Sequence, residues 1–201
     1  MSSERFHQRG GEAVRVEYTA HPPKATIFCR GTAAFRSRLA RDLACLLDVD
    51  SEVEGWECQP FELAVGDTLH TPDFLVTYVG GARWLLDASD AGGDPDVTDA
   101  ATSRGFNHRY VARDKIETGY RLRNARDLLR YGSFRCPLGD RIRVMAALDE
   151  VGSFTVAEGL GLFREGPPMA GLASLVLQRI LSLELDDALI SPDTLVRRAD
   201  R

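Results

Sequence analysis

Lysine is scarce in this sequence of 201 residues: 25 residues are basic, and only two of them are lysines. Cysteine is scarce as well, and the four cysteines form no C-x-x-C pair, which argues against a zinc site or a disulfide framework and favours buried free thiols. No apolar run approaches the roughly 20 residues that a membrane span requires. The N-terminus also lacks the basic-then-apolar pattern of a signal peptide. These absences predict a cytoplasmic protein with no membrane partner.

The share of charged residues is ordinary, but the charges are unevenly distributed along the sequence. The net charge is −5, with 44% hydrophobic and 27% charged residues, which is typical of a globular protein. Between residues 104 and 143, eleven basic residues face only four acidic ones. Such a local excess could follow a phosphate backbone, although a solvated helix surface is the alternative. The residues that we predict to contact DNA are Arg104, Arg109, Arg121, Arg123, Arg126 and Arg130.

The most informative stretch is a predicted β-hairpin. Residues 74–79 and 82–88 are rich in β-branched and aromatic side chains, and Gly80-Gly81 between them suits a two-residue turn. Asp73 opens the first strand and Asp87 closes the second, so a hairpin brings their carboxylates side by side. Because hard divalent cations prefer oxygen ligands, the pair is a candidate cation site.

These residues resemble the core of the PD-(D/E)xK nucleases, and more narrowly that of TnsA, the endonuclease subunit of a heteromeric transposase. The family pattern of Asp, Asp or Glu, any residue and Lys falls here on Asp73, Asp87, Ala88 and Ser89. The resemblance implies a DNA endonuclease in which Asp73, Asp87 and the carbonyl group of Ala88 bind Mg²⁺. It also implies DNA and a transposase-like protein as partners. Gln59-Pro60 is similar to the family as well.

Two catalytic positions depart from the family pattern. Ser89 stands where the family has lysine, and a hydroxyl is uncharged and a poor base at pH 7. Ala40 stands where the family's first helix contributes a glutamate, and Asp42 points about 200° away around that helix. Arginine is a weak substitute in proton transfer because its pKa exceeds about 12. The candidate catalytic set is therefore Asp73, Asp87 and Ser89, and we predict impaired catalysis.

The predicted fold is α/β: a restriction-endonuclease-like mixed sheet flanked by helices, followed by a small winged-helix-like helical domain. We expect a flexible leader at residues 1–24, with a short strand at residues 14–18. The nuclease-like domain is expected at residues 25–131 and the C-terminal domain at residues 138–198. For the first domain, the pattern predicts a helix from an N-cap at Thr32 to Asp48, strands at 53–58, 61–65 and 106–112, and helices at 95–104 and 120–131.

The expected C-terminal domain contains helices at residues 138–151, 154–160 and 167–183, and a wing at residues 185–190. In a winged helix that reads DNA, the third helix presents polar and basic side chains outward. Here only Gln178 and Arg179 on that helix are long and polar, which favours packing against a partner.

These observations leave three hypotheses about the function of the protein. The first is a TnsA-like nuclease fold with impaired catalysis that retains DNA or partner binding. The second is an active Mg²⁺-dependent endonuclease that uses Asp73 and Asp87. The third is a winged-helix regulator or adaptor in which the two aspartates only cap turns. None of these hypotheses gives the histidines a role. We interpret His70 as a surface turn residue and His108 as a strand residue without a metal role.

Overall fold

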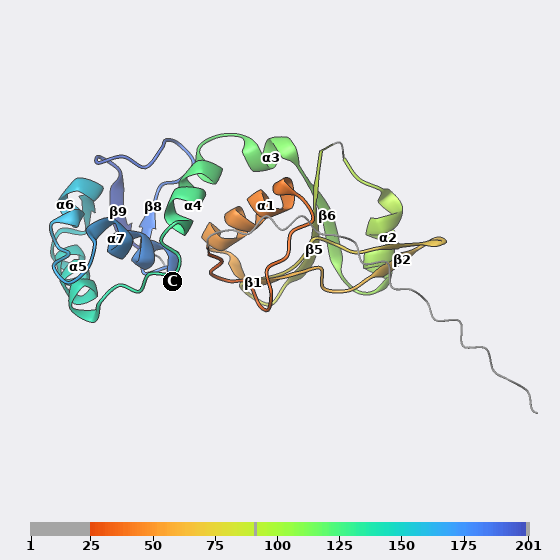
Figure 1. The fold of residues 1–201 in the computed structure, drawn as a ribbon, viewed down its shortest axis with the longest axis horizontal. Coiled ribbons are helices and arrows are strands. Elements are labelled where there is room, and N and C mark those ends of the chain that lie inside the picture. Colours follow the sequence, from red (N-terminus) through yellow and green to blue (C-terminus); the bar gives the residue numbers. More distant parts are fainter. Residues whose placement is uncertain (1–24, 91, 200–201) are drawn as a thin grey trace, which may run out of the picture.

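The computed structural model describes residues 25–90 and 92–199 of a mixed α/β protein, so the leader and the strand predicted within it lie outside the described residues. The first lobe covers residues 25–131 and the second lobe residues 138–199 (Figure 1). The elements of the first lobe are α1 (Arg38–Val49), β1 (Val53–Cys58), β2 (Leu63–Val65), β3 (Thr68–His70), β4 (Phe74–Tyr78), β5 (Arg83–Ser89), α2 (Pro95–Ser103), β6 (Asn107–Ala112), α3 (Arg113–Glu117) and α4 (Arg121–Leu129).

A four-stranded mixed sheet organises the first lobe, in the order β1-β4-β5-β6. The predicted hairpin is confirmed: β4 and β5 pair antiparallel, and both turn glycines have positive φ, 87° at Gly80 and 86° at Gly81. The helix predicted at residues 95–104 and the strand predicted at residues 106–112 are present as α2 and β6, and α2 connects β5 to β6, which runs parallel to it.

Neighbouring residues of a strand point to opposite sides of the sheet, and helices cover both of these sides. Leu86 belongs to the core cluster beneath α1, whereas Leu85 packs with Val97 and Ala101 of α2. Burial on both faces explains why the β5 sequence contains an almost continuous run of apolar residues.

Two predicted boundaries in the first lobe are wrong. The first helix begins at Arg38 and not after Thr32, because the side chain of Ser37 accepts a hydrogen bond from the Ala40 amide and caps the helix. The strand predicted at residues 61–65 is confined to β2, which pairs with β3, a strand absent from the prediction.

The second lobe contains α5 (Leu138–Val151), β7 (Ser153–Thr155), α6 (Val156–Leu160), α7 (Pro168–Leu177), β8 (Leu181–Leu183) and β9 (Leu195–Arg198). Its strands form an antiparallel sheet in the order β7-β9-β8. The residues 185–190 expected to form a wing contain no strand and lie in the loop that joins the antiparallel strands β8 and β9. The helix predicted at 167–183 ends at Leu177, and Arg179 follows in the left-handed region with φ 56°.

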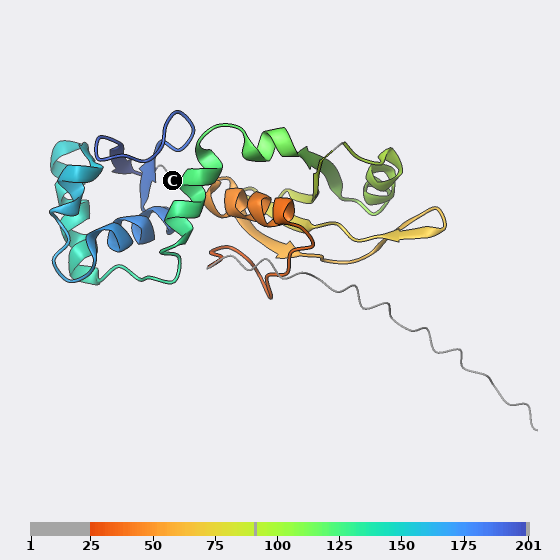
Figure 2. The same cartoon turned by 45° about the horizontal axis from the view of Figure 1, so that its top comes forward.

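The two lobes share one core across α4, which lies between them (Figure 2). Ala173, Leu177 and Leu185 from the second lobe pack in the same cluster as α1 and α4. The predicted boundary at residues 132–137 therefore falls in the loop between α4 and α5, but the packing continues across it. In residues 25–90 and 92–199, the structure has no helix with both the length and the apolar character needed to cross a bilayer.

Candidate functional site

The two aspartates meet at one edge of the sheet. Asp73 precedes the first residue of β4, and Phe74 pairs with Leu86, so Asp73 lies beside Asp87 of β5. The backbone N–H of Asp73 donates to Oδ1 of Asp87 at 2.9 Å. Both residues are buried, with 6% of Asp73 and 3% of Asp87 exposed. The expected convergence of the two carboxylates is confirmed.

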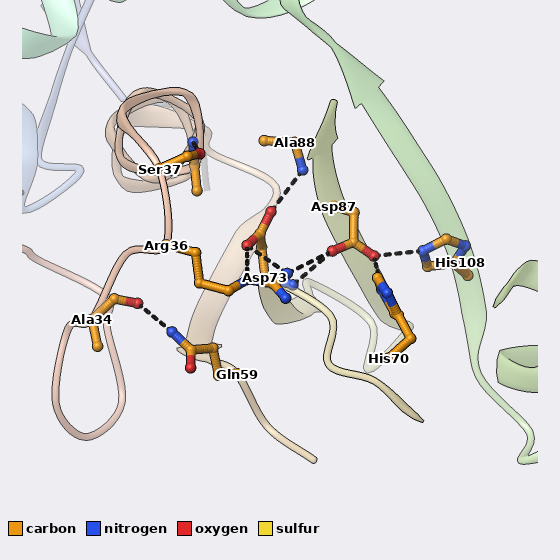
Figure 3. Close-up of polar contacts among 10 residues, drawn as sticks. Ala34, Arg36, Ser37, Gln59, His70, Asp73, Asp87, Ala88 and His108 are labelled. Carbon is orange, nitrogen blue, oxygen red and sulfur yellow. Dashed lines mark hydrogen bonds and ion pairs between the residues drawn. The ribbon is translucent and has the colours of Figure 1, made fainter. Parts of the chain in front are cut away.

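A single guanidinium group joins the two carboxylates. Arg36 lies in the loop before α1 and points between the aspartates (Figure 3). Its Nε donates to Oδ1 of Asp73 at 2.9 Å, and its Nη2 donates to Oδ1 of Asp87 at 3.1 Å. The side chain is 31% exposed, so this ion pair network is only partly accessible to water. Arg36 was not expected from the sequence, because no local pattern connects this loop to the hairpin.

Two histidines complete the site, which corrects the interpretation of both from the sequence. Nε2 of His70, at the end of β3, lies 2.8 Å from Oδ2 of Asp87, and Nε2 of His108, on β6, lies 3.0 Å from the same oxygen. Nδ1 of His108 lies 2.9 Å from the hydroxyl group of Thr98 on α2. The His108 side chain is fully buried. A strand containing His108 was predicted, but the register that places His108 opposite Leu85, two residues from Asp87, was not.

The two carboxyl groups have opposite pKa shifts. Burial opposes ionisation of Asp87, but hydrogen bonds from His108 and His70 outweigh it and hold the pKa of Asp87 below its ordinary value. At Asp73 burial dominates over the nearby Arg36, so its pKa is raised. Asp87 is therefore the firmly ionised member of the pair, and Asp73 accepts a proton more readily.

The resemblance to the nucleases implies Mg²⁺, but the arrangement of the residues does not fit a bound metal ion. Oδ2 of Asp73 accepts a hydrogen bond from the backbone N–H of Ala88 at 2.9 Å. With the contacts of Arg36, His70 and His108, all four carboxylate oxygens then have protein hydrogen-bond partners. Within residues 25–90 and 92–199, no group of three or more His, Cys, Asp or Glu residues has the arrangement of metal ligands. The guanidinium group of Arg36 supplies the positive charge between the carboxylates.

The remaining catalytic positions lie apart from this network. The hydroxyl group of Ser89 donates to the carbonyl oxygen of Gly92. Ala40 is completely buried in α1. Asp42 faces α4, where its Oδ2 lies 2.5 Å from Nη2 of Arg126. The orientation predicted for Asp42 is therefore confirmed, and α1 directs this carboxylate away from Asp73.

The predicted DNA-binding arginines fall into two groups. Four make contacts within the protein: Arg104 with the carbonyl group of Glu62, Arg109 with the hydroxyl group of Tyr78, Arg121 with Asp186, and Arg126 with Asp42. Arg123 on α4 and Arg130 directly after it are exposed, and Arg130 lies 3.6 Å from Asp127. Arg38, Arg123 and Arg126 also line a cavity of about 300 Å³ between α1 and α4. Arg104 and Arg109 are exposed too, so only Arg121 and Arg126 among the six predicted residues are partly buried.

Neither protein-family models nor curated proteins give a match to this chain.

Proposed function

We propose that this chain is a TnsA-like nuclease-fold protein that acts on DNA in transposition or mobile-element processing and retains binding without efficient cleavage. The observation that carries the proposal is the salt bridge of Arg36 to both Asp73 and Asp87. An internal cation at this position compensates the two negative charges that a metal ion would otherwise compensate. The presence of Ala40 and Ser89 in place of the family's Glu and Lys also supports a protein without efficient cleavage.

The order of the elements supports a nuclease-like ancestry. The antiparallel hairpin β4–β5, the α2 crossover to β6 and the cover of α1 are what a restriction-endonuclease-like core requires. In the second lobe, the order α5-β7-α6-α7-β8-β9 with the sheet β7-β9-β8 supports the winged-helix-like assignment. Seven of the ten residues of α7 are buried. The helix packs within the protein and contains no charged residue, so it offers no basic face to DNA. We therefore propose that the second lobe docks on a partner, with a transposase-like protein as the proposed partner.

Cleavage and binding are tested separately on the full chain. We expect no nicking of supercoiled plasmid with Mg²⁺ or Mn²⁺, either by the wild type or by Asp73→Ala. We expect binding of a fluorescent duplex that weakens as salt rises. Arg123→Ala with Arg130→Ala should reduce the salt slope by about one for each phosphate that the variant no longer neutralises. Arg164→Ala, at an exposed arginine of the second lobe, is the matched control.

Each alternative has its own outcome. Nicking by the wild type that is lost in Asp73→Ala would favour an active Mg²⁺-dependent endonuclease over our proposal. Duplex binding that is absent, or unaffected by the two α4 substitutions, would favour a regulator or adaptor that acts through protein contacts alone.

The role of Arg36 is tested by removing its side chain. Arg36→Ala leaves two adjacent carboxylates without their shared cation, so we expect measurable Mn²⁺ binding by calorimetry where the wild type has little or none. Arg38→Ala removes a nearby arginine whose side chain is 73% exposed, and it should leave Mn²⁺ binding as in the wild type. Equal Mn²⁺ affinity in all three proteins would contradict the role assigned to Arg36.

A further inference from the structure

Two of the four cysteines form a pair beside the carboxylate site. Cys29 lies in the segment before α1 and forms a parallel β-bridge with Trp56 of β1, and Cys58 is the last residue of the same strand. Residues that pair across neighbouring strands point to the same face, and so do residues two apart on one strand, so both thiols lie on the face of β1 that carries Trp56 and pack against the same core. Both residues are only partly buried, whereas Cys45 is buried in α1. The pair is therefore accessible to small reagents.

The two sulfur atoms have different surroundings. Sγ of Cys58 accepts from the backbone N–H of Ala34 at 3.4 Å, whereas the thiol of Cys29 donates to the carbonyl oxygen of Gly31 at 3.9 Å. The neighbouring Cys29 thiol and the Ala34 N–H lower the pKa of Cys58, while the neighbouring Cys58 thiol and burial raise the pKa of Cys29. Burial instead raises the pKa of Cys45 to about 11. Cys58 is thus the thiol of the pair that forms a thiolate more readily, and Cys29 is in place to react with it.

The pair is linked to Arg36 through a short run of contacts. Ala34, whose N–H contacts Cys58, accepts a hydrogen bond from the side-chain amide of Gln59 at 3.1 Å (Figure 3). Gln59 has a left-handed backbone with φ 47°, and its N–H donates to the carbonyl group of Asp73 at 3.0 Å. Arg36 follows Ala34 by two residues. A change at the sulfur atoms would therefore act on the loop that carries the guanidinium group.

We propose that Cys29 and Cys58 are an oxidation site for hydroperoxides, which closes to an intramolecular disulfide and alters the loop that carries Arg36. In the first step, the thiolate of Cys58 attacks a peroxide oxygen; the O–O bond breaks, and Cys58 becomes a sulfenic acid as hydroxide leaves and is protonated. In the second step, Cys29 attacks that sulfur; the S–O bond breaks and a disulfide forms. With hydrogen peroxide, two thiols and one peroxide give one disulfide and two waters.

The disulfide itself is independent of the proposed function, and only its effect on the carboxylate site rests on that function. Closing the bond joins the two sulfur atoms, and Sγ of Cys58 becomes a disulfide sulfur, which is a weaker acceptor for the N–H of Ala34. The segment between Gly31 and Ser37 then loses one of its attachments to β1. We expect the docking of Arg36 on Asp73 and Asp87 to change as a result.

The first test counts thiols in the full chain after treatment with one equivalent of hydrogen peroxide. Alkylation under denaturing conditions should label four cysteines before oxidation and two after it, and peptide mapping should join Cys29 to Cys58. Cys58→Ser should keep three labelled thiols, with Cys136→Ser as a matched control that still forms the bond. Four labelled thiols after oxidation of the wild type, or a bond to Cys45 or Cys136, would overturn the proposal.

The second test measures amide hydrogen exchange in residues 30–37 of the oxidised and reduced forms. We expect a several-fold change in exchange rate there, and none in α6, which lies in the other lobe. A disulfide with unchanged exchange in this segment would overturn the link to Arg36. Neither test depends on DNA binding or cleavage, so a failure of the proposed function would be distinguishable from a failure here.

Discussion

Asp73 and Asp87 are the same residue type, yet the fold gives them opposite roles. Asp87 accepts hydrogen bonds from Arg36, the Asp73 amide and two histidines, whereas Asp73 depends mainly on Arg36 and the Ala88 amide. The difference lies in the number of donors, since both carboxylates are buried to a similar extent. At this scale, adjacency of the carboxylates was predictable, because an antiparallel hairpin is a local structure. The hydrogen-bond donors around the two carboxylates were not predictable, because they come from four separate segments of the chain.

This asymmetry predicts different effects of neutralising each carboxylate. The pKa of Asp87 is lowered on folding, so its stabilisation is present above the unfolded value of about 3.9 and is lost as pH falls toward the folded value. The pKa of Asp73 is raised, so its contribution is present below about 3.9 and is lost as pH rises through the folded value. At pH 7, Asp87→Asn should cost about 1–3 kcal/mol, and Asp73→Asn less than about 1 kcal/mol.

Urea denaturation at pH 7 and pH 3 checks this prediction. The difference in stability between the two variants should narrow at pH 3, which lies below the unfolded pKa, because the ionised form of Asp87 contributes less there. A larger loss for Asp73→Asn than for Asp87→Asn at pH 7 would show that the assignment of the two carboxyl groups is reversed.

Among the elements, α4 has the clearest structural role. Its outer face carries Arg123, and the exposed Arg130 follows its last residue, while its buried face is shared by the two lobes. Asn124 lies on the buried face and is fully enclosed. Its side-chain amide donates to the carbonyl groups of Leu185 and Ala188, and its oxygen accepts from the amide of Ile190. A helix was predicted at residues 120–131 and a wing at residues 185–190, but the sequence did not predict that Asn124 holds this loop.

Substitution of Asn124 by Asp is a sharp test of this role. The change replaces an N–H donor with an oxygen that faces two carbonyl oxygens in a buried site. We expect a loss of about 2–4 kcal/mol in the free energy of unfolding, measured by chemical denaturation. Asp127→Asn, on the exposed face of the same helix, should stay within about 0.5 kcal/mol of the wild type. Equal stability of Asn124→Asp and the control would contradict the anchoring role.

At the scale of the whole molecule, Arg179 connects the second lobe to the first. It follows α7 in a left-handed conformation, and its Nη2 donates to the carbonyl groups of Asp50 and Val53. Its guanidinium carbon lies 3.8 Å from the ring centre of Phe28. These contacts, with the shared core at α4, couple the lobes mechanically.

Coupling of this kind predicts one cooperative unfolding transition for the wild type. Arg179→Ala should lower the stability of both lobes together, by about 1–3 kcal/mol, because two carbonyl groups and an aromatic face lose their cationic partner. Scanning calorimetry combined with hydrogen exchange in α1 and α5 measures the effect. Arg197→Ala, at an exposed position on β9, is the control. A second lobe that unfolds alone in the wild type would contradict the coupling.

The sequence by itself determined the parts of this protein that depend on neighbouring residues. The Gly80-Gly81 turn, the pairing of Asp73 with Asp87 and most helices follow from local spacing and turn chemistry. Tertiary structure alone decided which side chains surround the carboxylates. Arg36, His70 and His108 reach Asp87 from segments 17 to 51 residues away, and such contacts depend on how the chain packs. The cation between the two aspartates is therefore a property of the fold, because no local pattern connects it to them.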